Sequence, residues 1–463
     1  MKKFRKITAA VLVGAALVSA ISGCSQEKKT ASESGVSEIN IWSNDSHSKI
    51  EMLKLVEEFN RTTGKEQGIK VVYTIKEGDY NQIVDMAITS EQEPEMFVSG
   101  RIDQYSEQGK IVPLEELPGG NELVAQYDAQ MLSAREFTAK DGKIYRVPFN
   151  ITTFGLVYNK DMFKRYGIVD ENGEAKPPVT FEEMREYAKK MTDPSKQDYG
   201  IVLPMKWAHF YTMDVEALAL SSCGITGYDP VKGVYDFSGM KPIFEMYMGF
   251  KEDNSYFPGS EGLENDAARA QFAERNIAMK FAGSYDVGVF NTQFPAKCDW
   301  GVAPMPVENP NDRYKQKMTL SGNLVISRSA MDTVGADKLM TVFKWYHGKD
   351  VLKALYEKGL TIPYSEEIIK EANPTETQKG WKEFAELVSV SYIGADAAPT
   401  DMQGAPGMST IFMEKIWGGD MSIDEGIKIA TENTNKAMEY RFSADKTLDK
   451  SRYIKPDWDI RLD

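Results

Sequence analysis

The sequence has few of the residues from which metal sites and catalytic sites are usually built. Among its 463 residues are three histidines and three cysteines, and no two histidines have the spacing of an HExxH motif, so no metal site is predicted. A GxxxxGK[ST] loop, a GxGxxG loop after a strand and a GxSxG serine motif are all missing, which excludes the common phosphate-binding loops and the serine elbow. We therefore expect neither a cofactor nor an enzyme. A cell-surface glycosidase, which needs only two carboxylates, stays open as an alternative.

Positive charge is also scarce. The chain has 55 Lys and Arg against 69 Asp and Glu, a net charge of −14, and four of the basic residues fall in the first 23 positions. A field of this sign repels phosphate backbones, so nucleic acid is excluded as a partner. Hydrophobic residues at 42% and charged residues at 27% are typical of a globular protein, and the length suits two or three domains.

Long hydrophobic runs are missing except for one near the start. Residues 7–21 carry no charge and follow the basic Lys2, Lys3, Arg5 and Lys6. A run of this length is short for the ~30 Å hydrocarbon layer, so the pattern predicts a signal peptide, with a short membrane anchor as the alternative.

The residues after this run indicate how export ends. Ser22 and Gly23 lead directly into Cys24, and this string resembles a bacterial lipobox. The resemblance implies that residues 1–23 are a lipoprotein signal peptide and that Cys24 becomes the lipidated first residue of a protein held at the extracellular face of the cell membrane. Residues 24–37 are small and polar and are predicted to form a flexible tether. Whether Cys223 and Cys298 pair is left open.

The pattern of hydrophobic residues predicts an α/β fold. Three short strands alternate with two helices in the first hundred residues: strands at 37–42, 69–75 and 95–100, helices at 47–64 and 81–91. This βαβαβ order is typical of a parallel sheet flanked by helices. We expect Gly64 to end the first helix. After residue 141 the same order resumes, with a helix from Thr180 that has Glu183 at the capping-box position.

Two segments carry a resemblance to a known family. Residues 141–168, DGKIYRVPFNITTFGLVYNKDMFKRYGI, and residues 177–193, PPVTFEEMREYAKKMTD, resemble the signature of bacterial extracellular solute-binding proteins (family 1) of ABC importers, in the carbohydrate-binding group that includes maltose-binding protein. Further similar segments occur in the family's order: EPEMFVSG lies before these two segments, and NIAMKFAGSYD, WGVAPMP and GLTIPY lie after them. The chain has Glu95 where the family often has Asp, and Tyr285 where it often has Trp.

The resemblance implies a two-lobed fold, each lobe a mostly parallel sheet flanked by helices, joined by crossover hinges. The first lobe would comprise residues 38–142 and 323–358, and the second residues 143–322 and 359–463. A carbohydrate would bind in the cleft, the lobes would close around it, and the closed monomer would deliver it to the ABC transporter permease subunits.

Candidate ligand contacts lie where predicted strands end, because the ligand crevice of an α/β sheet lies beyond the carboxyl ends of its strands. Sugars need flat aromatic faces together with fixed polar groups. The candidates that meet these conditions are Trp42, Asn44 and Asp45 after the first strand, Tyr80 after the second, Ser99 at the end of the third, Asn150 at the crossover, Trp207 and His209 after a later strand, and Tyr285 and Asp286 in the segment where the family has its stacking aromatic. Trp42 and Trp207 could instead belong to the core, and Asn150 could make a hinge hydrogen bond.

The sequence thus predicts a lipid-anchored receptor that binds a sugar or oligosaccharide and does not alter it. A binder of another solute, such as a peptide, is the first alternative, and the glycosidase is the second. A structural surface protein is disfavoured because the chain has no repeats.

Overall fold

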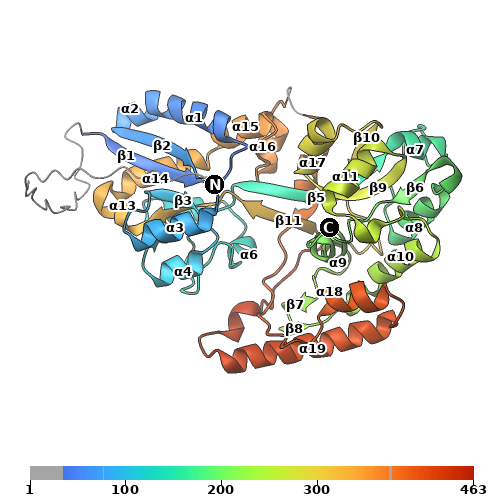
Figure 1. The fold of residues 1–463 in the computed structure, drawn as a ribbon. Coiled ribbons are helices and arrows are strands. Elements are labelled where there is room, and N and C mark those ends of the chain that lie inside the picture. Colours follow the sequence, from blue (N-terminus) through green and yellow to red (C-terminus); the bar gives the residue numbers. More distant parts are fainter. Residues whose placement is uncertain (1–34, 77, 375–377, 463) are drawn as a thin grey trace, which may run out of the picture.

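The computed structural model describes residues 35–76, 78–374 and 378–462. The predicted signal peptide and the lipidation site Cys24 lie outside these residues. The described chain forms two α/β lobes side by side (Figure 1), which confirms the predicted fold class. No helix in this part of the chain combines the length and the apolar character needed to cross a membrane.

The sheet of the first lobe has five strands in the order β2-β1-β3-β12-β4, and only β12 runs against the others. Helices cover both of its faces. The cores on the two faces are separate: α1, α14 and α15 pack on one, α3 and α4 on the other. The strands are β1 (Ser37–Ser43), β2 (Ile69–Ile75), β3 (Met96–Val98), β4 (Ile111–Val112) and β12 (Leu324–Ser327). The helices are α1 (Lys49–Arg61), α2 (Thr63–Gln67), α3 (Tyr80–Thr89), α4 (Ile102–Glu107), α5 (Gly120–Val124), α13 (Arg328–Thr333), α14 (Ala336–Tyr346), α15 (Lys349–Glu357) and α16 (Glu366–Glu371).

The sheet of the second lobe has the order β13-β11-β5-β9-β6, with β10 also paired to β5, and here β5 is the strand that runs against the others. Its strands are β5 (Asn150–Asn159), β6 (Tyr199–Ile201), β9 (Ile277–Gly283), β10 (Trp300–Ala303), β11 (Gln316–Ser321) and β13 (Ser391–Tyr392), and a separate hairpin is formed by β7 (Tyr228–Asp229) and β8 (Val234–Tyr235). The remaining helices are α6 (Ala129–Leu132), α7 (Lys160–Arg165), α8 (Phe181–Lys190), α9 (Glu216–Cys223), α10 (Lys241–Glu252), α11 (Asn265–Glu274), α12 (Asp286–Gly288), α17 (Trp381–Glu386), α18 (Met408–Thr410) and α19 (Ile423–Ala444). Every residue of β9 is buried, as expected of a strand with helices on both faces.

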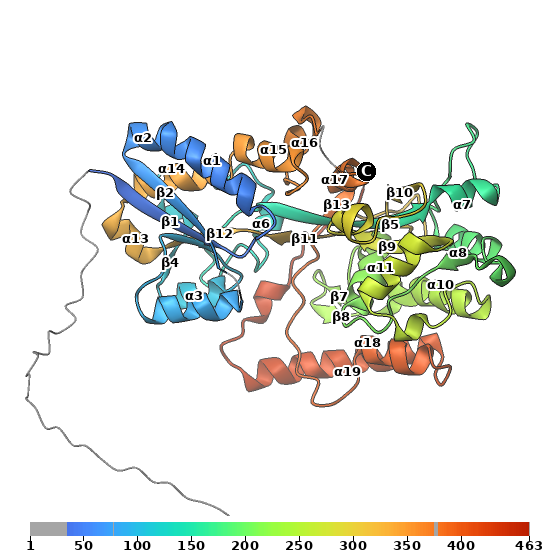
Figure 2. The same ribbon diagram turned by 45° about the horizontal axis from the view of Figure 1, so that its top comes forward.

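Strands β5 and β11 connect the lobes (Figure 2). They pair antiparallel, with Asn150 opposite Ser321 and Thr153 opposite Met318. The third crossover follows α15, where the N–H of Ile151 donates to the carbonyl of Ile362 over 2.9 Å. The lobe limits expected from the sequence stay a prediction. Buried residues of the segment 131–137 pack in a cluster with Ile151 and other residues of the second lobe.

Capping residues and glycines in the sequence explain where several helices begin and end. Thr180 caps α8, and its hydroxyl accepts from the N–H of Glu183 over 3.1 Å, as the capping pattern predicts. The expected end of the first helix at Gly64 is wrong: α1 ends at Arg61, and Gly64 lies inside the next helix, α2, which is capped by Gly68 with a φ of 62°. Gly64 has a different role: a Cβ there would lie 2.7 Å from the carbonyl oxygen of Ile69, so the residue allows the helix to approach β2.

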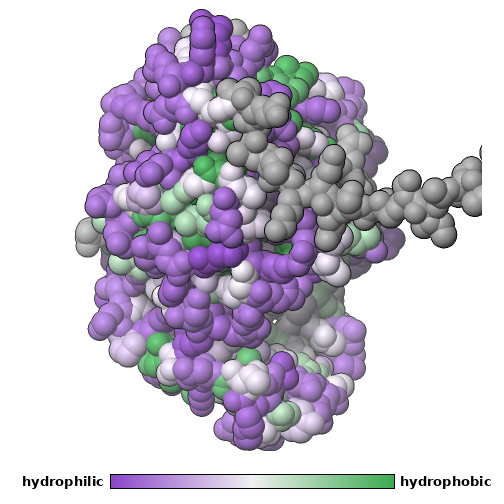
Figure 3. All heavy atoms as spheres, turned by 90° about the vertical axis from the view of Figure 1, so that its left-hand side faces the viewer, coloured by the Kyte–Doolittle hydropathy of each residue, from purple (hydrophilic) through white to green (hydrophobic). Residues whose placement is uncertain are grey.

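The C-terminal part of the chain reaches across both lobes. Helix α19 runs below the second lobe toward the first (Figures 1 and 2), and an Arg452 amino group then lies 3.9 Å from a carboxylate oxygen of Asp103. The chain returns to the second lobe, where Ile460 is buried. Figure 3 shows the molecule from the side of the first lobe: this face is largely hydrophilic, hydrophobic residues form small separate patches, and the surface is hollowed above the level of α19.

The two cysteines among the described residues, Cys223 and Cys298, are free thiols, which answers the question of pairing left open by the sequence. Burial raises the pKa of each thiol to about 11, so neither is an activated nucleophile.

Burial of His347 makes the stability of the first lobe depend on pH. Its ring is buried beside Phe149 and Phe343, and this burial lowers its pKa from 6.5 to about 4. Between these values the unfolded chain binds a proton that the folded chain does not, so this contribution to stability is complete above pH 6.5 and is lost as the pH falls to 4. We expect the difference in unfolding free energy between the wild type and His347→Gln to shrink by up to roughly 3 kcal/mol from pH 7 to pH 4. Urea unfolding across this range measures it, and a constant difference would contradict the prediction.

Candidate functional site

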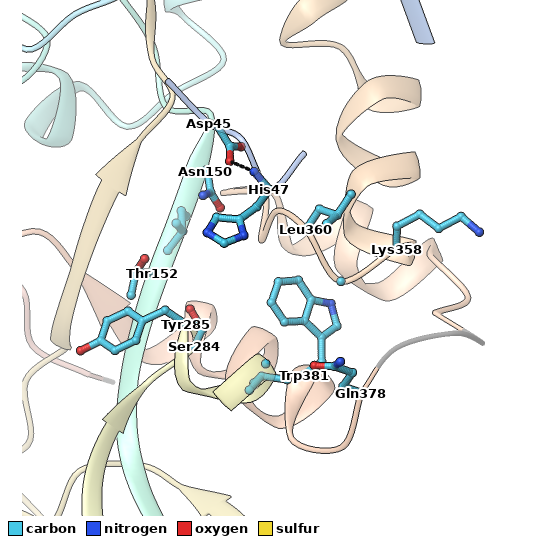
Figure 4. A pocket seen from close by; sticks show the side chains of 14 residues that line it. Asp45, His47, Asn150, Thr152, Ser284, Tyr285, Lys358, Leu360, Gln378 and Trp381 are labelled. Carbon is cyan, nitrogen blue, oxygen red and sulfur yellow. Dashed lines mark hydrogen bonds between the residues drawn. The ribbon is translucent and has the colours of Figure 1, made fainter. Parts of the chain in front are cut away.

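A cavity of about 470 Å³ lies between the lobes, beside the hinge strand β5 (Figure 4). Three parts of the fold meet around it: the loop after β1 and the end of α15 from the first lobe, the start of β5, and the turn after β9 together with α17 from the second lobe. The lining residues are Asp45, His47, Asn150, Ile151, Thr152, Ser284, Tyr285, Val287, Gly288, Lys358, Gly359, Leu360, Gln378 and Trp381.

The first lobe contributes a loop that is ordered by its own hydrogen bonds. The carboxylate of Asp45 accepts from the N–H of His47 over 3.1 Å and from the hydroxyl of Ser48 over 2.5 Å, just before α1 begins at Lys49. Ser43, at the end of β1, accepts from the N–H of Asp45 over 3.1 Å. These bonds between neighbouring residues help to hold Asp45 at the cavity directly after its strand, which is why its position could be inferred from the sequence.

The hinge contributes Asn150, whose amide joins the three crossovers. Its oxygen accepts from the N–H of Ile362 over 3.2 Å, and its nitrogen donates to the hydroxyl of Ser321 over 3.2 Å. The alternative interpretation of Asn150, a hinge hydrogen bond, is thus present in the structure. The same residue lines the cavity, so the two interpretations are compatible.

The second lobe presents Tyr285 at the turn after β9. Its side chain is 44% exposed, its ring packs edge-on against Phe154 at 6.2 Å, and the guanidinium carbon of Arg269 lies 5.5 Å from the ring centroid. Its neighbour Asp286 is fully buried and accepts from the N–H of Gly283 over 3.1 Å. Asp286 therefore supports the turn from beneath and does not line the cavity.

The sequence analysis missed Trp381, Gln378 and His47. Trp381 is mostly buried, and its indole N–H donates to the carbonyl of Tyr356 over 3.1 Å. Figure 4 shows its ring below Leu360, on the other side of Ser284 from Tyr285. Trp381 begins a helix rather than following a strand, so a search of strand ends could not find it. Gln378 lies in the segment before the same helix.

The structure brings Asp45, Asn150 and Tyr285 together at the cavity, and places the other candidates elsewhere. Trp42 is half-buried, with the Lys76 ammonium 4.0 Å from its ring centroid. The hydroxyl of Tyr80 donates to the carbonyl of Trp42 over 2.9 Å, and burial raises the pKa of this phenol. Ser99 is buried and accepts from the N–H of Arg101.

The last three candidates also lie outside the cavity lining. The ring centroids of Trp207 and His209 lie 5.5 Å apart in the second lobe, where Trp207 is half-buried and His209 exposed. Asn44 is exposed beside Asp45. Their role in ligand binding stays a prediction.

The lining suits reversible binding of a polar molecule. Amide, hydroxyl and carboxylate groups offer donors and acceptors, and Tyr285 and Trp381 offer aromatic surface. Among the residues that the structure describes, Asp45 is the one carboxylate in the lining, so these residues do not supply the pair of carboxylates that glycoside hydrolysis uses. Within the described ranges, no group of three or more His, Cys, Asp or Glu side chains could hold a metal ion.

Gly380 positions the cavity residue Trp381. Its φ is +88°, and a Cβ there would lie 2.2 Å from the ring of Trp300, which is itself buried. Because both the backbone and the neighbouring ring oppose a side chain, Gly380→Ala should lower the free energy of unfolding by roughly 2 to 4 kcal/mol. Gly394→Ala is the matched control, since no atom lies within 4 Å of its Cβ position and its φ is not positive. Thermal unfolding of both variants measures the effect, and equal changes would show that Gly380 is not constrained in this way.

Comparison with known proteins supports the fold and identifies the family. The sequence model of the family described as bacterial extracellular solute-binding protein matches residues 46–346. The maltotriose-binding protein of Pyrococcus abyssi is 25% identical over 350 residues, which cover 73% of this chain and 69% of that protein. The sn-glycerol-3-phosphate-binding periplasmic protein UgpB of Brucella abortus is 31% identical over 147 residues, which cover 30% of this chain and 33% of that protein.

A solved structure is similar over the whole fold. The cyclic α-maltosyl-1,6-maltose-binding protein of Arthrobacter globiformis matches with a TM-score of 0.65 at 16% identity, covering 88% of this chain and all of that chain (100%). At this identity the similarity shows the two-lobed fold alone. Together with the family match, which spans well over half of the sequence, it shows that the chain belongs to the bacterial extracellular solute-binding protein family.

Proposed function

We propose that the protein is the lipid-anchored solute-binding component of an ABC importer, which captures a sugar or oligosaccharide between its lobes and delivers it as a monomer to the permease. The observation that carries this proposal is the cavity beside the hinge, which is lined by the half-exposed Tyr285 from one lobe and by polar groups from the other lobe and from β5. The residues proposed to contact the ligand there are Asp45, Asn150 and Tyr285, with Trp381, Gln378 and Ser284 added from the structure.

The chemistry of the lining favours a carbohydrate. One face of a pyranose presents C–H groups that pack on an aromatic ring, and its hydroxyls donate and accept hydrogen bonds at once, which suits the mixed lining. A cavity of about 470 Å³ lies within the range of small-ligand sites. The maltotriose-binding relative supports the same class of ligand.

Binding would be coupled to closure of the lobes. A ligand that touches both lobes favours the closed arrangement by the difference between its contacts in the two states. Asn150 and Ser321 lie at the crossovers where such a motion would bend the chain. The predicted contacts outside the present lining, above all Trp207 and His209, would then approach the ligand only on closure.

Calorimetric titration with maltotriose tests the proposal. We expect binding to the wild type and an affinity at least about tenfold lower for Tyr285→Ala, because truncation removes the exposed aromatic surface. Tyr440→Ala is the matched control: this tyrosine is 45% exposed on α19, outside the cavity lining, and its loss should leave the affinity unchanged. Equal effects of the two substitutions would contradict the assigned site. Release of reducing ends during incubation would instead identify a glycosidase.

A phosphorylated polyol is the second candidate ligand. The UgpB relative binds sn-glycerol 3-phosphate according to its name, and the polar groups of the lining would also suit the hydroxyls of such a polyol. Heat on titration with sn-glycerol 3-phosphate, together with none for maltotriose or other saccharides, would favour this candidate. Heat with peptides alone would favour the peptide alternative.

Cys24 provides a separate test of the lipid anchor. We expect a palmitate probe to label the wild type in its native host, and Cys24→Ser to lose both the label and the association with the membrane fraction, because the acyl chains would be attached at this thiol. Cys223→Ser and Cys298→Ser are controls that should keep the label. A Cys24→Ser variant that stays labelled would refute the assignment, and retention of residues 1–23 in the purified protein would favour the short membrane anchor.

A further inference from the structure

The partly exposed ring of Tyr285 is in contact with the side chain of Arg269, which belongs to helix α11. The guanidinium of Arg269, on α11, lies over this ring at 5.5 Å, and the Arg269 side chain is only 15% exposed. On another side, the ring packs so closely on Gly283 that a Cβ there would lie 2.6 Å from it. Together with the edge-on contact of Phe154 on β5, these contacts define where the ring lies, and the charged one comes from α11.

Arg269 is itself held in place by two carboxylates. One amino group lies 2.7 Å from a carboxylate oxygen of Asp266, and the other forms an ion pair with the fully buried Asp286. The second carboxylate oxygen of Asp286 accepts from the N–H of Gly283. A single buried carboxylate thus ties the guanidinium to the turn that carries Tyr285.

Further buried charges surround this ion pair. Lys280 on β9 and Asp214 in the π-helical turn Tyr211–Val215 are both buried and interact electrostatically with Asp286. The Lys280 ammonium donates to the carbonyl of Phe281 over 2.7 Å. Two cations and two carboxylates are therefore enclosed beneath one exposed ring. Burying charge is costly unless the charges are paired, and here the two cations lie close to the two carboxylates.

We propose that Arg269 is a positioning residue for ligand binding, which holds the Tyr285 ring in the orientation that it presents to the inter-lobe cavity before a ligand arrives. The inference rests on the proposed function, because it assigns Arg269 to the same site. A tyrosine side chain has two rotatable torsions, and fixing them at the moment of binding lowers the affinity. The cation over the ring fixes them in the free protein, and Asp286 keeps that cation from turning toward water.

A double-mutant cycle with maltotriose tests whether Arg269 acts through the ring. We expect Arg269→Gln to weaken binding about five- to tenfold in the wild-type background, as loss of a cation–π contact implies, and less than about twofold in the Tyr285→Ala background. Arg275→Gln is the matched control: Arg275 follows α11 directly, its guanidinium lies 5.9 Å from the ring of Phe257, and neither residue lines the cavity. Equal weakening by Arg269→Gln in both backgrounds would overturn the proposal.

A second measurement needs no ligand. In protein labelled with 3-fluorotyrosine, Tyr285→Phe identifies the fluorine resonance of Tyr285. We expect Arg269→Gln to move this resonance toward the value of a freely rotating exposed tyrosine, and Arg275→Gln to leave it in place. An unchanged resonance would overturn the proposal. If maltotriose does not bind the wild type, the proposed ligand is refuted, and this spectrum still decides whether Arg269 orients the ring.

If Arg269→Gln does not fold, the same two measurements are made on Arg269→Lys. Lysine keeps a positive charge near the ring but lacks the planar guanidinium of arginine, in which one amino group pairs with Asp266 and the other with Asp286. We expect a weakening of about two- to threefold that requires the Tyr285 ring, together with a smaller movement of the fluorine resonance. Equal affinity and an unmoved resonance in Arg269→Lys would overturn the role assigned to the guanidinium.

Discussion

The antiparallel pairing of β5 with β11 joins the two lobes and fixes how they are connected. Phe149, just before β5, stacks on Tyr346 in the core of the first lobe at 4.4 Å, and Phe154 belongs to the core of the second lobe. Only residues 150–153 lie between these two anchors, and they pair with β11 and with Ile362. A hinge this short would confine the bending of the proposed closure to one place. The cavity lies beside this place, so its width would depend on that bending.

The composition of the site follows from this arrangement. A strand end supplies polar loop residues such as Asp45, the hinge supplies the amide of Asn150, and the turn after β9 supplies Tyr285. Each group is held by bonds within its own element or crossover. Tyr285 differs, because its ring depends on charges that come from α11 and from the sheet beneath it. The aromatic contact is therefore the part of the site that depends most on distant packing.

The sequence predicted the fold class and the family because these depend on local patterns. Strand 69–75, the capped helix at Thr180 and the order of short motifs are all set by neighbouring residues. The site was predicted only in part. Asp45 follows its strand directly and could be found in this way, whereas Trp381 lies at the start of a helix and reaches the cavity only through the third crossover. Tyr80 and Asp286 occupy the expected positions in the chain, but their polar groups bond to backbone within the protein, and the sequence does not show which way a side chain turns.

The place of β12 in the first sheet sets the order in which the chain can fold. This strand lies between β3 and β4, although more than 200 residues separate it from either in the sequence. During synthesis, β4 can join the sheet only when its partner β12 has emerged, which comes after the strands of the second sheet up to β11. Pairings of such long range form slowly, because the entropy of closing a long loop must be overcome first. The first sheet is therefore incomplete until β12 has been synthesised, and β3 has an unpaired edge during this interval. Chaperones that protect unpaired strand edges would act on the nascent chain at this stage.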